Sequence, residues 1–125
     1  MARFEIPGRL PGLNEYTDAC RRNPYAGAKL KQMSQERAAW AIRSQLKGYT
    51  ANKPVVLRYA WVELDRRRDK DNIAGFGHKV IQDALVECGT LKGDGWRHIK
   101  GFSDDFEVDK NNPRVIVTIE EVEDD

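Results

Sequence analysis

Two aspartates separated by a single residue, Asp69 and Asp71, follow directly on a run of three arginines at 66–68. Carboxylates this close repel each other unless a cation lies between them. Mg²⁺ suits such a pair, because it takes oxygen ligands and keeps several of its waters. A metal held there would supply a water nucleophile and offset the charge on a phosphate. The spacing therefore predicts metal-assisted phosphodiester chemistry, with the arginines binding phosphate.

The same residues have a simpler explanation, because a helix is expected to begin here. An aspartate at that position is usually an N-cap, worth about 1 kcal/mol. One aspartate satisfies a cap, whereas Asp69, Asp71 and Asn72 together exceed that need. A calcium EF-hand is excluded, because a loop counted from Asp69 would have Ile73 at its fifth position and Val80 where a glutamate is required.

Lys79 and Asp83 stand four residues apart on the expected helix. If that helix is continuous, we expect Asp71 to share a face with them. Lys79 would then contact a phosphate or a leaving group. Otherwise it forms a surface ion pair with Asp83, worth a few tenths of a kcal/mol. His78 and His98 flank the cluster as candidates for phosphate contact or proton transfer, although a surface or hydrogen-bonded histidine is the commoner case.

Length and charge bound the function classes. The 125 residues are expected to form one domain, residues 1–125, with a hydrophobic core. The net charge of +1 hides a polarity: residues 1–58 hold 11 Lys and Arg against 4 Asp and Glu, whereas residues 59–125 hold 10 against 16. This polarity indicates a polyanionic partner for the basic half, although a solvated charged surface explains it equally well.

The chain has no apolar run long enough to span a membrane and no apolar signal-like start, so we expect a cytoplasmic protein without a membrane partner. In that compartment Cys20 and Cys88 are expected to be reduced thiols. No spacing of cysteine and histidine fits a zinc site.

Hydrophobic periodicity and breaker residues place the elements that must position these side chains. The pattern predicts strands at 3–6, 55–64 and 114–120, the second of them central because it is apolar at nearly every position. Residues 98–108 are expected to form a strand with a break at 103–105, followed by a hairpin turn at 111–112.

Two helices are predicted. One begins at Ser34 and ends at Gly48, and the other runs from the aspartates to Cys88, with its regular part beginning near His78 because of two early glycines. Residues 10–28 are expected to be a long irregular loop, which in a small domain is usually functional or disordered. The order of elements predicts a small α+β domain with a mixed β-sheet, two main helices and the helices on one face.

At the central residues the chain resembles the RusA family of Holliday-junction resolvases, common in bacteria and their prophages. The family pattern is a basic run, Asp-x-Asp-Asn, a helical Lys followed four residues later by Asp-Ala-Leu, a Gly, and an acid beyond. This chain carries the pattern as Arg66-Arg67-Arg68, Asp69-Lys70-Asp71-Asn72, Lys79, Asp83-Ala84-Leu85, Gly89 and Asp94. A looser match lies in Pro11-Gly12-Leu13-Asn14-Glu15-Tyr16.

The chain departs from the family in two places. About four extra residues, close to one helical turn, separate Asn72 from Lys79. The family has a pair of acids in the loop beyond the helix, where this chain has the single Asp94. Asp104 and Asp105 are candidates for a further carboxylate, although a turn explains them more simply.

The resemblance implies a homodimer that resolves four-way DNA junctions by paired nicks, in DNA recombination and repair. It implies that Mg²⁺, or Mn²⁺ in its place, is bound by Asp69, Asp71 and Asp94, and that Lys79 acts on the scissile phosphate. The expected DNA contacts are Arg66, Arg67, Arg68, Arg21, Arg22 and Asn14.

Two rival functions remain open from the sequence. One is a non-enzymatic module that binds junction or duplex DNA, with the acids capping a helix. The other is a protein-interaction domain that uses the acidic tail at 120–125 and has no affinity for DNA. Dependence on Mg²⁺ separates the nuclease from the binding module, since a binder needs its basic residues but no metal.

Overall fold

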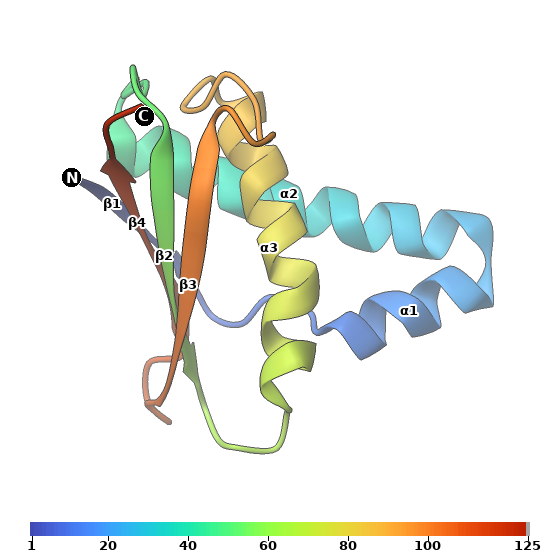
Figure 1. Ribbon diagram of the computed structural model, residues 1–125. Coiled ribbons are helices and arrows are strands. Elements are labelled where there is room, and N and C mark those ends of the chain that lie inside the picture. Colours follow the sequence, from blue (N-terminus) through green and yellow to red (C-terminus); the bar gives the residue numbers. More distant parts are fainter. Residues whose placement is uncertain (125) are drawn as a thin grey trace.

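The computed structural model describes residues 1–124, which form a small single α+β domain (Figure 1). One four-stranded mixed sheet and three helices make up the described part of the chain. In chain order the elements are β1 (Ala2–Pro7), α1 (Leu13–Arg22), α2 (Pro24–Leu46), β2 (Val55–Glu63), α3 (Lys70–Glu87), β3 (Ile99–Val108) and β4 (Arg114–Glu121). The predicted fold class is confirmed, with one helix more than expected.

The sheet has the strand order β1-β4-β2-β3. β2 is parallel to β3 and antiparallel to β4, and β1 pairs antiparallel with β4. The apolar run in β2 therefore lies between two neighbours, as its composition predicts. α2 and α3 cover one face of this sheet (Figure 1), and the opposite face carries the outward-pointing residues of each strand.

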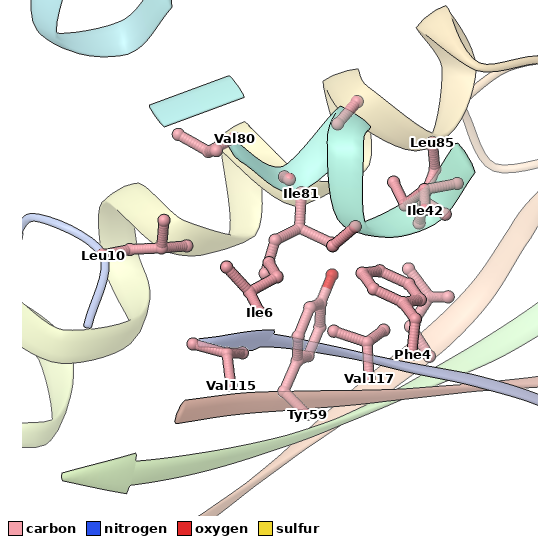
Figure 2. Packing of buried hydrophobic residues seen from close by; sticks show 14 of the residues in the cluster. Phe4, Ile6, Leu10, Ile42, Tyr59, Val80, Ile81, Leu85, Val115 and Val117 are labelled. Atoms are coloured by element: carbon pink, nitrogen blue, oxygen red, sulfur yellow. The ribbon is translucent and has the colours of Figure 1, made fainter. Parts of the chain in front are cut away.

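The core lies between the sheet and these two helices. Phe4 and Ile6 of β1, Tyr59 of β2 and Val117 of β4 point from the sheet into the same buried cluster (Figure 2). Ile42 of α2 completes that cluster from the helical side. Burial of these large side chains fixes the positions of both helices, because each contributes roughly 1.5–3 kcal/mol when it leaves water.

The segment 10–28 is helical, and the prediction of an irregular loop there is wrong. Pro24 is the first residue of α2, where its fixed backbone suits a helix and its missing N–H is not needed. The Asn23 side chain caps that end, accepting hydrogen bonds of 2.9 Å from the backbone N–H groups of Tyr25 and Ala26. Ser34 is consequently inside α2, where its Oγ donates to the Leu30 carbonyl instead of capping a helix.

The predicted start of α3 at the aspartates is confirmed, but the helix is regular from Lys70 onward, so the prediction that its regular part begins near His78 is wrong. Gly75 and Gly77 are both part of the helix, and Gly77 serves its packing. A Cβ on Gly77 would lie 2.5 Å from the Trp61 ring, whereas a Cβ on Gly75 would lie 3.2 Å from the flexible end of Leu13. Tertiary packing against β2 thus outweighs the low helix propensity of glycine.

The predicted hairpin at 111–112 is wrong, because β3 and β4 are not neighbours. β4 enters the sheet between β1 and β2, so the turn after β3 carries the chain across β2. β3 runs unbroken through 103–105, since its backbone pairs with β2 at Arg58, Tyr59 and Ala60. Asp104 and Asp105 are therefore strand residues and form no turn.

Two further expectations concern membranes and thiols. Within residues 1–124, no helix combines the length and the apolar character that a membrane span requires. Cys20 is exposed and Cys88 half-buried, and both are free thiols.

Candidate functional site

A cleft of about 720 Å³ opens where β2 ends and α3 begins. The end of β3 closes its other side, and the loop between β2 and α3 forms its floor. Acidic and basic side chains share this small volume, and two of the predicted aspartates are among them. The residues that line it are Glu63, Asp65, Arg66, Arg68, Asp69, Lys70, Asp71, Ile73, Phe106, Glu107 and Val108.

Asp69 occupies the N-cap position of α3, but its carboxylate makes no capping hydrogen bond. Its backbone carbonyl accepts the first helical hydrogen bond, 3.0 Å from the Ile73 N–H. Within residues 1–124 the Asp69 carboxylate has no hydrogen bond and no ion pair. The capping explanation therefore accounts for the position of Asp69 but not for its charged side chain.

Asp71 lies in the first turn of α3 and is exposed in the same cleft. Its carboxylate is likewise without a partner in the described chain. Asp69 has extended backbone at the N-cap, whereas Asp71 is already helical. Both still line one cleft, and the positive end of the helix dipole favours their negative charges there.

A buried ion pair anchors the base of the cleft. Glu63, at the end of β2, has a side chain only 6% exposed. The Arg68 guanidinium donates to both of its oxygens, at 3.0 and 2.8 Å, and Arg9 approaches at 3.6 Å. Arg68 also donates to the Leu10 carbonyl. Arg68 therefore holds the loop that carries Asp69, and its predicted contact with DNA stays a prediction.

The other basic residues of the run point outward. Arg66 lines the cleft and is exposed, while Arg67 lies 3.5 Å from Asp65 with its side chain 89% exposed. Lys70 lies above the Phe106 ring, with its ammonium 5.5 Å from the ring centre. Arg66, Arg67 and Lys70 are thus the cations beside the cleft that a phosphate can reach.

Asn72, the last residue of the Asp-x-Asp-Asn motif, connects the site to α1. Its Oδ1 accepts a hydrogen bond of 2.8 Å from the backbone N–H of Asn14. Gly12 allows this approach, because a Cβ there would lie 2.6 Å from the same oxygen. Asn72 thereby caps α1 from outside that helix. The Asn14 side chain is exposed beside this contact, so its predicted role in binding DNA stays a prediction.

Lys79 lies outside the cleft, about 12 Å along the α3 axis from Asp71 and a quarter-turn around it. Its ammonium lies 3.2 Å from Asp83, which also accepts a hydrogen bond of 2.7 Å from Lys31. Burial acts to raise the pKa of Asp83, but the hydrogen bonds from Lys31 and Lys79 outweigh it and lower that pKa. α3 is continuous between Asp71 and Lys79, but Lys79 and Asp83 are not among the residues that line the cleft, so the role of Lys79 at a phosphate stays a prediction.

Asp94 is not brought to the other two aspartates within the chain. It lies in the loop after α3, at the end of that helix opposite Lys70 (Figure 1). The 18 residues of α3 separate these ends by about 27 Å. Asp94 and its neighbour Trp96 are both exposed, and Trp96 is 97% accessible.

His78 and Asp104 form a cluster that the sequence did not reveal, since 26 residues separate them. The His78 Nε2 lies 2.7 Å from Asp104 Oδ1, and the same oxygen accepts a hydrogen bond of 2.7 Å from the Trp61 indole. His78 also packs against the rings of Tyr59 and Phe102. Asp104 is therefore occupied away from the cleft.

The two remaining expected contacts lie on a different element. Arg21 and Arg22 are in the last turn of α1 and are exposed. They sit at the junction with α2, far from the start of α3 (Figure 1). The structure thus divides the predicted site residues among the cleft, the end of α1 and the loop after α3.

The cleft contains acids that the sequence analysis did not single out. Asp65 and Glu107 line it beside Asp69 and Asp71. Asp65 could have been predicted from the sequence, because it directly precedes the arginines. Glu107 could not, since only the pairing of β3 with β2 brings it to the cleft. Among residues 1–124, no three His, Cys, Asp or Glu side chains gather closely enough to hold a metal by themselves.

The two free aspartates nevertheless fit Mg²⁺. This cation retains several waters, and proteins commonly bind it through one or two carboxylates together with phosphates of the substrate.

A scan of the chain against protein-family models finds no match, and a search of curated proteins finds no relative.

Proposed function

We propose that this protein is a Mg²⁺-dependent, structure-selective endodeoxyribonuclease of the RusA type, acting on four-way DNA junctions. One observation carries the proposal: Asp69 and Asp71 face a single cleft with carboxylates that no group of the described chain satisfies. Unpaired acids beside exposed cations are better explained by binding of a metal and a phosphate than by a contribution to the stability of the fold. The sequence resemblance supplies the substrate class.

In this proposal Asp69 and Asp71 hold the cation at the start of α3. The metal, when bound, supplies an activated water and offsets charge on the phosphate. Arg66 and Lys70 would bind phosphates on either side of the scissile bond. Attack of water on phosphorus with departure of the 3′ oxygen would leave a 5′-phosphate and a 3′-hydroxyl. Glu63 and Arg68 keep the loop in place while DNA enters.

Asp94 enters this proposal through the homodimer. A separation of about 27 Å along α3 prevents Asp94 from sharing a cation with Asp69 and Asp71 of its own chain in this conformation. The length of α3 does not keep Asp94 of a second subunit away from this cation. Lys79, bound to Asp83 and outside the cleft, is left with a role in positioning DNA beyond the scissile phosphate.

The direct test incubates purified protein with an end-labelled four-way junction and a matched linear duplex, first with Mg²⁺ and then with EDTA. We expect paired nicks in the junction alone, and only with Mg²⁺. Junction cleavage that continues in EDTA would contradict the metal mechanism. Mn²⁺ is expected to replace Mg²⁺, since both favour oxygen ligands.

Asp71→Asn tests the assignment of the cation site. The substitution keeps the size of the side chain and removes the charge that holds the metal, so cleavage should fall at least a hundredfold while junction binding in EDTA is retained. The matched control is Asp105→Asn, an exposed carboxylate of β3 that does not line the cleft. It should cleave at the wild-type rate, and equal rates for both variants would exclude Asp71 as a ligand.

The alternative function is a non-enzymatic module that binds junction or duplex DNA. The observation in its favour is that no group of three potential ligands assembles within residues 1–124. Junction binding without nicks, unchanged by Mg²⁺ or EDTA, would establish this alternative and leave the aspartates to stabilise the start of α3 through its dipole.

A further inference from the structure

α1 and the first half of α2 form a helical hairpin that projects from the body of the domain (Figure 1). α1 packs on α2 and α3, and the sheet lies on the far side of those two helices. The outer end of the hairpin, residues 21–29, is defined here as the hairpin tip. Because the neighbouring helices leave it exposed, its side chains are free to contact a partner.

The hairpin tip is strongly basic. Residues 19–35 include four Lys and Arg and no Asp or Glu. Lys31 is bound to Asp83 at 2.7 Å, whereas Arg21, Arg22 and Lys29 are exposed and make no ion pair within residues 1–124. Two acids of α1, Glu15 and Asp18, line one hollow with Arg22 and Lys29, so they border the cations on one side without forming an ion pair with them in the described chain. Positive charge is thus concentrated at the end of the hairpin.

An aromatic ring stands among these cations. Tyr25, in the first turn of α2, is 81% exposed. Within residues 1–124 its ring stacks on no other aromatic side chain, and its hydroxyl has no hydrogen-bond partner. Tyr25 and Lys29 are four residues apart on α2 and therefore share a face of that helix. A tyrosine flanked by cations can stack on a base while the cations bind adjacent phosphates.

Two contacts fix the backbone of the hairpin tip. Asn23 fixes the start of α2 through two hydrogen bonds of 2.9 Å. Gly27 lets the two helices approach so closely that a Cβ there would overlap the Cys20 side chain. The backbone that carries Tyr25 is therefore preorganised, which reduces the conformational entropy lost on binding.

The distance between the cleft and the hairpin tip follows from the length of α1. α1 begins at the contact between Asn14 and Asn72, beside Asp71, and its ten residues extend about 15 Å from there. At 3.4 Å per nucleotide, this distance corresponds to roughly four nucleotides of one B-form strand. DNA that leaves the cleft along α1 would reach the hairpin tip a few nucleotides from the scissile phosphate.

We infer that the hairpin tip is a second DNA-binding site, at which Tyr25 stacks on a base left unstacked at the branch point. Arg21, Arg22 and Lys29 bind the phosphates on either side. This inference rests on the proposed function and deepens it, because it gives selectivity for branched DNA a structural source in one subunit. A continuous duplex offers no free base face to Tyr25 and uses only the cations.

The test measures binding in EDTA, which separates it from catalysis. A fluorescent four-way junction and a matched duplex are titrated with wild-type protein and Tyr25→Ala. We expect roughly tenfold weaker junction binding for Tyr25→Ala and less than a twofold change for the duplex. Tyr25→Phe, which keeps the ring, should bind the junction like wild type. Trp40→Ala is the matched control, because Trp40 is 73% exposed further along α2.

The double variant Arg21→Gln, Arg22→Gln tests whether these side chains bind phosphates. Its binding to both DNAs should weaken, and the slope of log affinity against log salt should become shallower by about 2, one for each phosphate that an arginine no longer neutralises. An unchanged slope would remove the arginines from the site. Circular dichroism of every variant verifies that the hairpin is still helical.

Each outcome bears on one proposal. If wild-type protein nicks the junction and Tyr25→Ala binds it equally well, the inference about the hairpin tip is overturned and the nuclease stands. An equal loss on junction and duplex also overturns it, because stacking at a branch requires a difference. If wild-type protein binds the junction but never nicks it, the nuclease fails while the junction-specific loss in Tyr25→Ala still supports the hairpin tip. Absence of any DNA binding overturns both.

Discussion

Neighbouring residues of one short motif perform different tasks in this protein. Asn72 caps α1, and Arg68 forms an ion pair with Glu63. The carboxylates of Asp69 and Asp71 are left without partners in the described chain. From the sequence these residues form one charged cluster. Only the last two have the unsatisfied charge that a metal site needs, which is why the catalytic proposal is confined to them.

The buried pair of Glu63 and Arg68 makes a prediction about stability. Glu63→Gln leaves the guanidinium of Arg68, only 14% exposed, beside a neutral side chain, so the free energy of unfolding should fall by about 2–3 kcal/mol. Urea unfolding measures this loss. Glu120→Gln is the matched control, since its partner Arg58 is 52% exposed, and it should cost less than about 1 kcal/mol. Equal losses would show that burial does not strengthen the inner pair.

Asp83 gives a prediction about pH. Its pKa in the folded protein is lowered, so its ion pairs with Lys31 and Lys79 stabilise the fold above its unfolded pKa of about 3.8 and lose that effect as pH falls below it. Asp83→Asn should therefore be less stable than wild type at pH 7, and this difference should shrink between pH 5 and pH 3. Urea unfolding at these three pH values measures it. A constant difference would indicate that hydrogen bonding, which asparagine retains in part, matters more than charge.

At the scale of elements, the strands were largely predictable from the sequence and the N-terminal helices were not. β1, β2 and β4 follow from alternating or continuous apolar runs. Residues 10–28 looked irregular because Pro11, Gly12, Pro24 and Gly27 all break helices in isolation. In the structure Pro24 begins a helix, and Gly12 and Gly27 admit neighbouring side chains, so each of these three has a packing or capping reason that single-residue propensity omits.

The two glycines of α3 differ in what surrounds them, and substitution by alanine should show it. Gly77→Ala should raise helix propensity but force a methyl group into the Trp61 ring, with a net loss of about 1–3 kcal/mol. Gly75→Ala meets only the movable end of Leu13, so it should be neutral or stabilise the protein by up to about 1 kcal/mol. Thermal unfolding of both variants measures the contrast. If both stabilise the protein, packing against Trp61 does not explain Gly77.

At the scale of the whole molecule, the candidate site was predicted in part. Asp69 and Asp71 could be found because only Lys70 separates them in the sequence and their chemistry is local. The separation of Asp94 from these two aspartates depends on the length and regularity of α3. Gly75 and Gly77 made that regularity hard to predict from the sequence. The pairing of Glu63 with Arg68 could not be foreseen either, since it follows from the path of the loop after β2.

The position of Asp94 leads to a prediction about subunits. If Asp94 acts across a dimer, mixing inactive Asp71→Asn with inactive Asp94→Asn should restore nicking. One of the two sites in the mixed dimer then has an intact set of acids. Subunits are exchanged by mild denaturation and refolding, and single nicks in the junction are counted. Persistent inactivity of the mixture, with mixed dimers demonstrated by differential tags, would place all the acids of a site on one chain.

The strand order also determines when the domain can form during synthesis. β1 is made first, yet its partner is β4, so Phe4 pairs with Val117 near the end of the chain. Until β4 has left the ribosome, β1 has no strand partner and β2 lacks one of its two. Such long-range pairing slows folding. A nascent chain of this protein is therefore expected to need protection from aggregation until β4 has emerged, and loss of β4 would leave β1 unpaired as well.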